Sequence, residues 1–184
     1  MRRIITTMHV TLDGMTARPN GRIDWVGQRP DAYDFDAFDR CDTCVLGRVM
    51  YPEYEKYWRG VVAGSNHTPE AKRYAEFANR TPHYVLTRSV QEFDWPVAFP
   101  VSDVAVIAAM REQPGDDIFV VGGATTVGSF INAGLLDEMR LTVHPLIASE
   151  GTSLFENVFT ERKCEMTEHI ALADGSIRLV YRAL

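Results

Sequence analysis

Short apolar blocks alternate with polar ones along this chain, and their spacing predicts the order of its strands and helices. Ile4–Val10 is rich in β-branched residues and is expected to form a strand. The segment after it, Thr11–Pro30, contains Gly, Pro, Asn and Asp and predicts a long loop. Phe35 and Phe38 lie three residues apart, which indicates a short helix within Asp31–Arg40 with one face toward the core.

The alternation of strands and helices continues to about two-thirds of the chain. Apolar runs predict strands at Thr43–Leu46, Tyr84–Thr87 and Ile118–Val121. Thr68 followed by Pro69 has the form of an N-cap with Pro at the first helical position. Helices are expected between and after these strands, at Met50–Trp58, Thr68–Asn79, Ser102–Gln113 and Thr125–Ala133.

The last third of the chain is mostly strand. Met139–Ile147 predicts a long strand, and Glu165–Leu172 and Ser176–Tyr181 flank a turn centred on Asp174 and form a hairpin. No repeat or linker divides residues 1–184, so we expect one domain. The pattern predicts an α/β fold: a mixed, mostly parallel sheet with helices on both faces and a C-terminal antiparallel hairpin.

Composition and charge narrow the class of protein. The chain is 46% hydrophobic and 24% charged, with a formal net charge of −6, and no Lys/Arg cluster forms a nucleic-acid surface. No apolar run approaches the roughly 20 residues that a membrane span needs. The first ten residues lack the features of a secretory signal, so we expect a cytoplasmic protein.

The cysteines do not indicate a metal or a disulfide. Cys41 and Cys44 form a C-x-x-C pair, but no second pair of ligands stands at a spacing that suits zinc. We interpret both as small buried apolar side chains.

Unusual residues follow three of the expected strands: Gly47-Arg48, Thr87-Arg88 and Gly122-Gly123. If these strands are parallel, their carboxyl ends meet at one edge, where α/β sheets bind ligands. Guanidinium groups bind phosphate oxygens, and so do the free N–H groups of a helix N-terminus. Each feature alone also fits a surface charge or an ordinary turn, and it is their coincidence at three strand ends that indicates a ligand site.

The glycine-rich stretch is not a common nucleotide-binding motif. FVVGGATTVG, from Phe119 to Gly128, is neither G-x-G-x-x-G nor a Walker A loop. A doubly wound dinucleotide fold and a P-loop NTPase are therefore disfavoured.

Four segments of the sequence carry a resemblance to a known family: TLDGMTA (Thr11–Ala17), VLGRVMY (Val45–Tyr51), YVLTRS (Tyr84–Ser89) and VVGGAT (Val120–Thr125). Together they resemble the dihydrofolate reductase-like superfamily, nearest to the reductase domain of the riboflavin-biosynthesis deaminase-reductase. The resemblance spans nearly the whole chain and implies an NADPH-dependent reductase, often a homodimer. The deaminase motifs H-x-E and P-C-x-x-C are absent from the sequence.

The resemblance implies a cofactor site at the three strand ends. It assigns Arg48 to the 2′-phosphate or pyrophosphate and Arg88 to the adenosine 2′-phosphate, which favours NADPH over NADH. Met50 stands where the family often has Thr, so a hydroxyl contact is lost or replaced by a backbone N–H. The cofactor-binding residues implied are Gly47, Arg48, Met50, Thr87, Arg88, Gly122, Gly123, Ala124 and Thr125.

The substrate side is expected along the loop from Thr11 to Arg29. Asp13 matches the related reductases as an acceptor for a substrate hydrogen bond, and it is equally consistent with a turn-forming Asp. Trp25 is a candidate wall of the substrate pocket, although a core or lid position explains it as well.

The resemblance also implies a carboxylate that orients the substrate and helps to protonate it. Asp31 is the first candidate and Asp34, one helical turn on, is the second; both also fit a helix N-terminus electrostatically. Thr142 is expected to face the substrate pocket, or it simply suits a strand. His9 and His144 are interpreted as packed or surface histidines rather than general acids.

Taken together, the chain is expected to be an oxidoreductase that transfers a hydride from NADPH to a C=N or C=O bond of a pterin- or pyrimidine-like substrate. In such a reaction the protein aligns donor and acceptor in a dry pocket. The alternative is a non-catalytic nucleotide-binding module that keeps the cofactor site.

Overall fold

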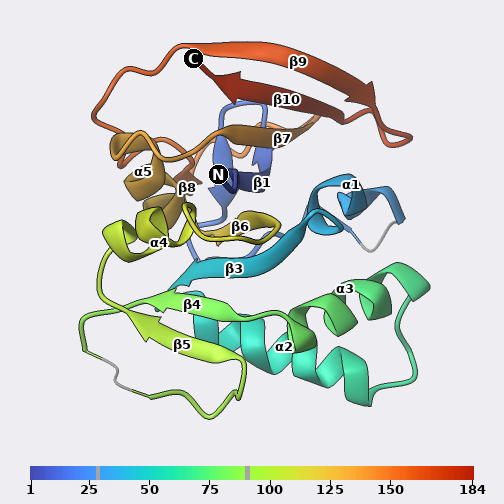
Figure 1. Ribbon diagram of the computed structural model, residues 1–184. Coiled ribbons are helices and arrows are strands. Elements are labelled where there is room, and N and C mark those ends of the chain that lie inside the picture. Colours follow the sequence, from blue (N-terminus) through green and yellow to red (C-terminus); the bar gives the residue numbers. More distant parts are fainter. Residues whose placement is uncertain (28–29, 90–91) are drawn as a thin grey trace.

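The centre of the molecule is a twisted sheet of eight strands, with the order β5-β4-β3-β6-β1-β7-β10-β9 (Figure 1). The computed structural model describes residues 1–27, 30–89 and 92–184. The strands are β1 (Ile4–Thr11), β3 (Cys41–Gly47), β4 (His83–Leu86), β5 (Ala98–Val101), β6 (Asp117–Gly122), β7 (Glu138–His144), β9 (Cys164–Ala171) and β10 (Ile177–Ala183). A separate pair, β2 (Met15–Ala17) and β8 (Thr152–Ser153), is antiparallel.

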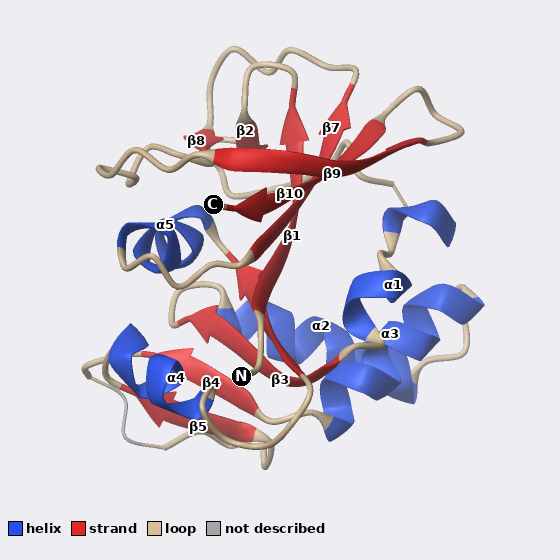
Figure 2. Ribbon diagram, turned by 45° about the horizontal axis from the view of Figure 1, so that its top comes forward, coloured by secondary structure: helices blue, strands red, loops and turns tan. Residues whose placement is uncertain are grey.

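Helices cover both faces of the sheet, as the alternating pattern predicts (Figure 2). One face packs against α1 (Phe35–Phe38), α2 (Tyr51–Ala63) and α3 (Pro69–Arg80). The other face packs against α4 (Val104–Met110) and α5 (Ala124–Asn132). The sheet therefore separates two apolar clusters.

Strands β5, β4, β3, β6, β1 and β7 are parallel, and β10 and β9 continue the sheet in antiparallel fashion. In the register, Gly47 lies opposite Leu86, and Leu46 lies opposite Gly122. The carboxyl ends of the parallel strands consequently meet at one edge, which we call the carboxyl edge. The predicted fold class, with its C-terminal hairpin, is confirmed.

Local capping explains where two helices begin. The Thr68 hydroxyl accepts a hydrogen bond from the Ala71 amide at 3.2 Å, so Thr68 caps α3 as predicted. Helix α4 begins one residue later than expected, because Asp103 accepts from the Ala105 amide at 2.8 Å. The prediction that Ser102 caps this helix is wrong.

Other boundaries differ from the pattern where local signals are weak. Helix α2 continues to Ala63, five residues beyond the expected end at Trp58. Strand β5 was not predicted, because Pro100 argues against a strand. The structure tolerates this proline because β5 lies at the edge of the sheet. The short strands β2 and β8 were also missed, since each needs the other to form.

The cysteine pair lies in the core. Cys41 and Cys44 are both buried in β3 beside α1 and α3, which confirms their interpretation as packed side chains. Burial raises the pKa of the Cys41 thiol to about 12, so it stays protonated at neutral pH.

We expect Phe119→Ala to reduce the free energy of unfolding by about 3–5 kcal/mol, since a truncated core aromatic leaves a cavity. Phe119 is 2% exposed, and its ring centroid lies 5.0 Å from that of Phe38. Urea unfolding measures the change. The matched control is Phe159→Ala, whose ring is 82% exposed and whose loss is expected to change stability by about 0.5 kcal/mol or less.

Candidate active site at the carboxyl edge

The carboxyl edge brings the first turn of α5 into close contact with the ends of β3 and β6. A Cβ at Gly47 would lie 2.6 Å from the Thr126 hydroxyl of α5, closer than side chains approach. Gly122 has a φ of +125°, and a Cβ there would lie 3.3 Å from the Met8 sulfur of β1. Both positions require glycine, so the backbone at this edge is bare.

The N-terminus of α5 faces this bare backbone. Gly123 is the N-cap residue and has no side chain to cap the helix. The first intrahelical bond runs from the Val127 amide to the Gly123 carbonyl at 3.0 Å, so the amides before Val127 have no partner within the helix. These amides, at Ala124 and Thr125 among others, and the helix dipole form a favourable position for an anion.

Two arginines flank the same edge. Arg48 and Arg88 are exposed in the turns that follow β3 and β4, and the Arg48 amide bonds the Leu86 carbonyl at 3.3 Å, which ties the two turns together. Among the residues that the structure describes, neither guanidinium makes a hydrogen bond or a salt bridge. Both are therefore available to an anionic ligand.

The remaining predicted cofactor residues lie in these turns. Met50 closes the turn after β3 through its amide, 3.1 Å from the Gly47 carbonyl, and its sulfur lies 4.0 Å from a Cβ built on Gly122. Thr87 is buried, and its hydroxyl accepts from the Ser89 amide at 3.3 Å. The structure thus gathers the three predicted turns at one edge.

A row of polar side chains crosses the sheet on the α1 side. His9 of β1 lies opposite Thr142 of β7, which lies opposite Arg178 of β10. Paired residues share a face, and the Arg178 Nε donates to the Thr142 hydroxyl at 3.3 Å. We call His9, Thr142 and Arg178 the polar row.

Asp34 is engaged by two arginines beside the polar row. Its carboxylate accepts from the Arg140 Nε at 2.5 Å and from the Arg140 Nη2 at 3.1 Å, and the Arg178 Nε lies 3.4 Å away. The Asp34 side chain is 4% exposed. Burial alone would lower the pKa of Arg140, but hydrogen bonds and charges from Asp34 and Glu138 outweigh it and raise that pKa.

This arrangement gives Asp34 the task of holding α1 on the sheet. Asp34 is the N-cap residue of α1, yet its side chain makes no capping bond because both oxygens bind arginine. Asp31 stands nearby in a 3-10 turn, and its backbone carbonyl accepts from the Arg178 Nη2 at 2.8 Å. The structure brings Asp31, Asp34 and Thr142 to the same arginine, Arg178.

Asp13 holds two loops together. It accepts from the Thr11 hydroxyl at 2.6 Å and from the backbone amides of Ala148 and Ser149 at 3.1 and 2.8 Å. These hydrogen bonds, led by that from Thr11, lower the pKa of the Asp13 carboxyl to about 2. These three hydrogen bonds are those of an Asp that fixes a turn, and a further hydrogen bond from a substrate to the ionised carboxylate stays a prediction.

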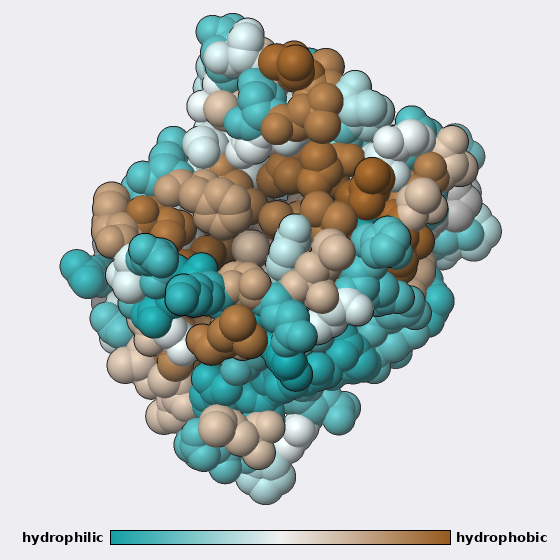
Figure 3. Space-filling view, turned by 90° about the horizontal axis from the view of Figure 1, so that it is seen from above, coloured by the Kyte–Doolittle hydropathy of each residue, from teal (hydrophilic) through white to brown (hydrophobic). Residues whose placement is uncertain are grey.

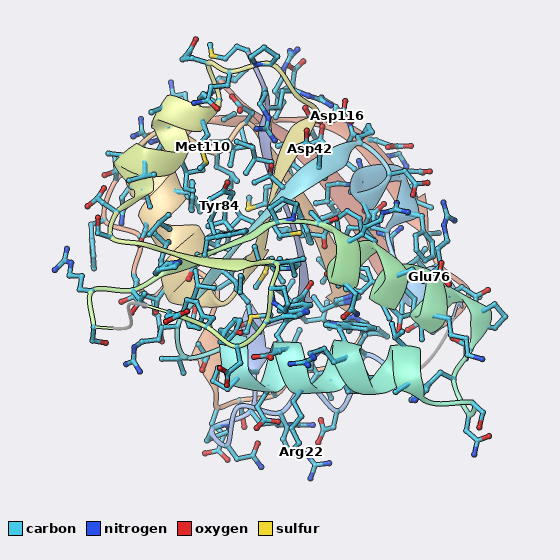
Figure 4. All side chains as sticks on the ribbon, turned by 60° about the horizontal axis from the view of Figure 1, so that its bottom comes forward. Arg22, Asp42, Glu76, Tyr84, Met110 and Asp116 are labelled. Atoms are coloured by element: carbon cyan, nitrogen blue, oxygen red, sulfur yellow. The ribbon has the colours of Figure 1, made fainter. Side chains whose placement is uncertain are left out.

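Trp25 lies in the loop that follows β2. Its side chain is half-buried, with the Arg18 guanidinium 5.2 Å from the ring centroid, and within the described residues its buried Nε1–H has no acceptor. Figure 4 shows Arg22 of the same loop across the molecule from Asp42 and Asp116, which mark the amino-terminal ends of β3 and β6. The loop consequently lies toward the carboxyl edge.

The structure also joins two histidines that the sequence left apart. His9 Nδ1 lies 2.9 Å from His144 Nε2, and His144 Nδ1 lies 3.8 Å from an Asp174 oxygen. His144 is 3% exposed, whereas His9 is half-buried. Interpreting the two as unrelated packed or surface residues missed this pair. The sequence does place both histidines near the ends of two expected strands. It does not show that these strands are neighbours in the sheet, so the contact could not be predicted.

Other features of the structure lie away from this edge. A hollow of about 320 Å³ lies on the α5 face, where Ile131, Met139, Tyr181 and others line it, and it includes no residue of the predicted site. Figure 3 looks onto the β9–β10 side and shows apolar atoms gathered there. Within the ranges described, no three His, Cys, Asp or Glu side chains are placed to hold a metal, and no helix has the length and apolar character to cross a bilayer.

The sheet order and the C-terminal hairpin are those of the dihydrofolate reductase-like fold. A crystal structure of a putative riboflavin biosynthesis protein from Shewanella sp. PV-4 has a TM-score of 0.76 and 21% identity, with 99% of each chain covered. Dihydrofolate reductase from Enterococcus faecalis, complexed with NADP(H), has a TM-score of 0.63 and 15% identity, with 98% of this chain and 96% of that chain covered.

The family follows from residues 2–177, which match the model of the RibD C-terminal domain. The chain belongs to this family. It is also 31% identical to the uncharacterized protein YyaP of Bacillus subtilis over 182 residues, 98% of this chain and 94% of YyaP. A deaminase/5-amino-6-(5-phosphoribosylamino)uracil reductase from Thermotoga maritima has a TM-score of 0.69 and 16% identity, with this chain covering 57% of its length.

Removing the Asp34 charge tests the role of the buried ion pair. Asp34→Asn leaves Arg178 without this buried carboxylate and leaves Arg140 with Glu138 alone, and we expect it to lower the free energy of unfolding by about 3–5 kcal/mol. Asp36→Asn changes an exposed acid in the same helix and is expected to cost about 0.5 kcal/mol or less. Equal urea midpoints for Asp34→Asn and the wild type would contradict this role.

Proposed function

We propose that this chain is an NADPH-dependent reductase that transfers a hydride to a C=N or C=O bond of a small heterocyclic substrate. The observation that carries the proposal is the carboxyl edge, where the ends of β3, β4 and β6 place two arginines beside bare glycine backbone and the N-terminus of α5. Family membership supports the same function.

The residues present fit a dinucleotide with an extra phosphate. The unpaired amides at the start of α5 suit the pyrophosphate, and the missing side chains at Gly47 and Gly122 allow it to approach the backbone. Arg48 and Arg88 supply positive charge for the remaining phosphate. When bound, a dihydronicotinamide supplies the electron pair and hydrogen for the reduction, and the protein positions it.

The α1 side of the sheet is the place proposed for the substrate. Its described groups are mostly donors: the arginines, the imidazole of His9 and the hydroxyl of Thr142. Among the residues that the structure describes on this side, the buried carboxylate is Asp34, which is already bound to Arg140 and Arg178. This side therefore suits a substrate that presents carbonyl or imine acceptors, such as an oxidised pyrimidine. It suits an aminopterin less well, because an aminopterin presents a pair of N–H donors.

Cofactor preference is the most direct measurement. We expect NADPH to bind at least about 10-fold more tightly than NADH, since a charge-assisted hydrogen bond contributes about 1.5–3 kcal/mol. Arg88→Ala should remove most of this difference and leave NADH affinity unchanged in isothermal titration calorimetry. Arg59→Ala, an exposed arginine of α2 that pairs with Glu55, is the control.

Turnover is then followed through the absorbance of NADPH with two probes, dihydrofolate and 5-amino-6-(5-phosphoribosylamino)uracil, the compound in the name of the Thermotoga protein. We expect the second to be the better acceptor. Equal affinity for NADPH and NADH would contradict the role of the arginines. Tight NADPH binding without oxidation by either probe would favour the non-catalytic nucleotide-binding module.

The homodimer implied by the resemblance stays a prediction. It gains support from β9, an edge strand whose residues are almost all exposed, and from apolar side chains on the hairpin such as Met166 and Ile177, 51% and 45% exposed. We expect sedimentation velocity to show a dimer for the wild type and a larger monomer fraction for Met166→Lys. A monomeric wild type would contradict it.

A further inference from the structure

Arg178 carries a buried positive charge beside the place proposed for the substrate. It lies on β10, next to β7 in the sheet (Figure 1), and its side chain is 8% exposed. Its Nε donates to the Thr142 hydroxyl at 3.3 Å and lies 3.4 Å from an Asp34 oxygen. Its Nη2 donates to the Asp31 carbonyl at 2.8 Å. The protein therefore engages two of its three nitrogens.

The third nitrogen of Arg178, Nη1, makes no hydrogen bond within the described residues. The same residues leave three buried polar side-chain atoms without a partner, and Nη1 is not one of them. It therefore belongs to the exposed part of the Arg178 side chain. Nη1 thus offers N–H donors at the surface, on a side chain whose other contacts fix its orientation.

Arg140, the other guanidinium bound to Asp34, differs from Arg178 in this respect. Its Nε and Nη2 both donate to Asp34, and its Nη1 donates to Glu138 at 3.2 Å. Asp34 thus binds Arg140 through two hydrogen bonds and Arg178 through one longer ionic contact. Arg178 consequently keeps positive charge and a donor for a further group, whereas each nitrogen of Arg140 already has a partner.

The register of the sheet places Arg178 close to the carboxyl edge. Arg178 lies opposite Thr142, which is two residues before the end of β7 at His144. With a rise of about 3.3 Å per residue, the polar row is about 7 Å from the end of that strand. The proposed cofactor site lies at the same edge, and β6, which contributes to it, is two strands away from β7. A ring that lies across these strands on the α1 side comes within reach of Arg178.

We propose that Arg178 determines substrate specificity by donating a hydrogen bond from Nη1 to a carbonyl oxygen of a pyrimidine-like ring. The inference rests on the proposed reductase function and adds one contact to its substrate. Thr142, Asp34 and the Asp31 carbonyl hold the guanidinium in place before the ring binds. Little side-chain freedom is then lost on binding, which favours affinity and selectivity.

A ring carbonyl fits this donor better than a phosphate or a carboxylate does. Guanidinium groups bind such anions mainly through two parallel N–H donors. In Arg178 the protein already engages Nε and Nη2, so one nitrogen remains for one acceptor atom. An amino group on the ring would instead turn an N–H donor toward the guanidinium, and a site that is built to donate rejects it.

A purely structural role explains only part of this geometry. The contacts of Arg178 with Asp31 and Asp34 hold the segment before α1 against β10. They do not involve Nη1, and Asp34 already has two hydrogen bonds from Arg140. A ligand contact accounts for the remaining donor.

Binding of two matched probes tests the proposal without turnover. The probes are 5,6-diaminouracil and 2,4,5,6-tetraaminopyrimidine, which share one ring but carry carbonyl oxygens and amino groups, respectively, at the same two positions. Affinities are measured by isothermal titration calorimetry with NADP⁺ at saturation, at a pH where both probes are neutral. We expect the wild type to bind the uracil at least about 10-fold more tightly, as for a charge-assisted hydrogen bond.

Arg178→Met assigns this preference to the guanidinium. Methionine fills similar space, and Asp34 keeps its hydrogen bonds from Arg140, so we expect the variant to fold. It should lose about 10-fold or more in affinity for the uracil and none for the tetraamine, so that the preference disappears. Arg178→Lys, which keeps a charge for Asp34 but lacks the fork of donors, should lose the preference as well. Arg182→Met, 63% exposed on the same strand, is the control.

The outcomes separate this proposal from the reductase function on which it rests. Equal affinity of the wild type for both probes, binding of neither probe beside NADP⁺, or an unchanged preference in the Arg178 variants would overturn it. So would a loss confined to 5-amino-6-(5-phosphoribosylamino)uracil, because the diaminouracil probe has no phosphate and the contact would then be with that group. Failure of NADP⁺ and NADPH to bind at all is a different result, because it rejects the reductase function itself.

Discussion

The close packing of α5 against the ends of β3 and β6 is the constraint on which the rest of the site depends. Thr126 occupies the space that a side chain at Gly47 would need, and Gly122 has a φ of +125°, a conformation that residues with a side chain rarely adopt. Only bare backbone allows the first turn of α5 to sit at this edge. That turn brings its unpaired amides beside Arg48 and Arg88, so sheet packing and anion recognition share one cause.

On the α1 side of the sheet, the place proposed for the substrate, ion pairs determine which side chains are available to a substrate. Asp34 is buried with Arg140 and Arg178, and this pairing joins α1 to β7 and β10. A buried carboxylate with two guanidinium partners anchors the fold more than it contacts a ligand. The substrate side thus differs from one built around a free acid, although the fold resembles that of dihydrofolate reductase.

Much of the fold was predictable from the sequence because its signals are local. Apolar runs located the long strands, and Thr68 marked the start of α3. The misses have local causes as well: Ser102 and Asp103 are both good capping residues, and only the backbone geometry selects Asp103. The edge strand β5 contains Pro100, so composition alone argued against it.

The sequence by itself determined the alternation of strands and helices, the three turns of the proposed cofactor site, two of them with glycine, and the family to which the chain belongs. Those properties depend on residue type and on spacing along the chain. The tertiary structure alone decided that His9 meets His144 and that Asp34 is neutralised by Arg140 and Arg178. These contacts join residues more than 100 positions apart, and they depend on strand order and register, which arise from packing of the whole sheet rather than from any local pattern.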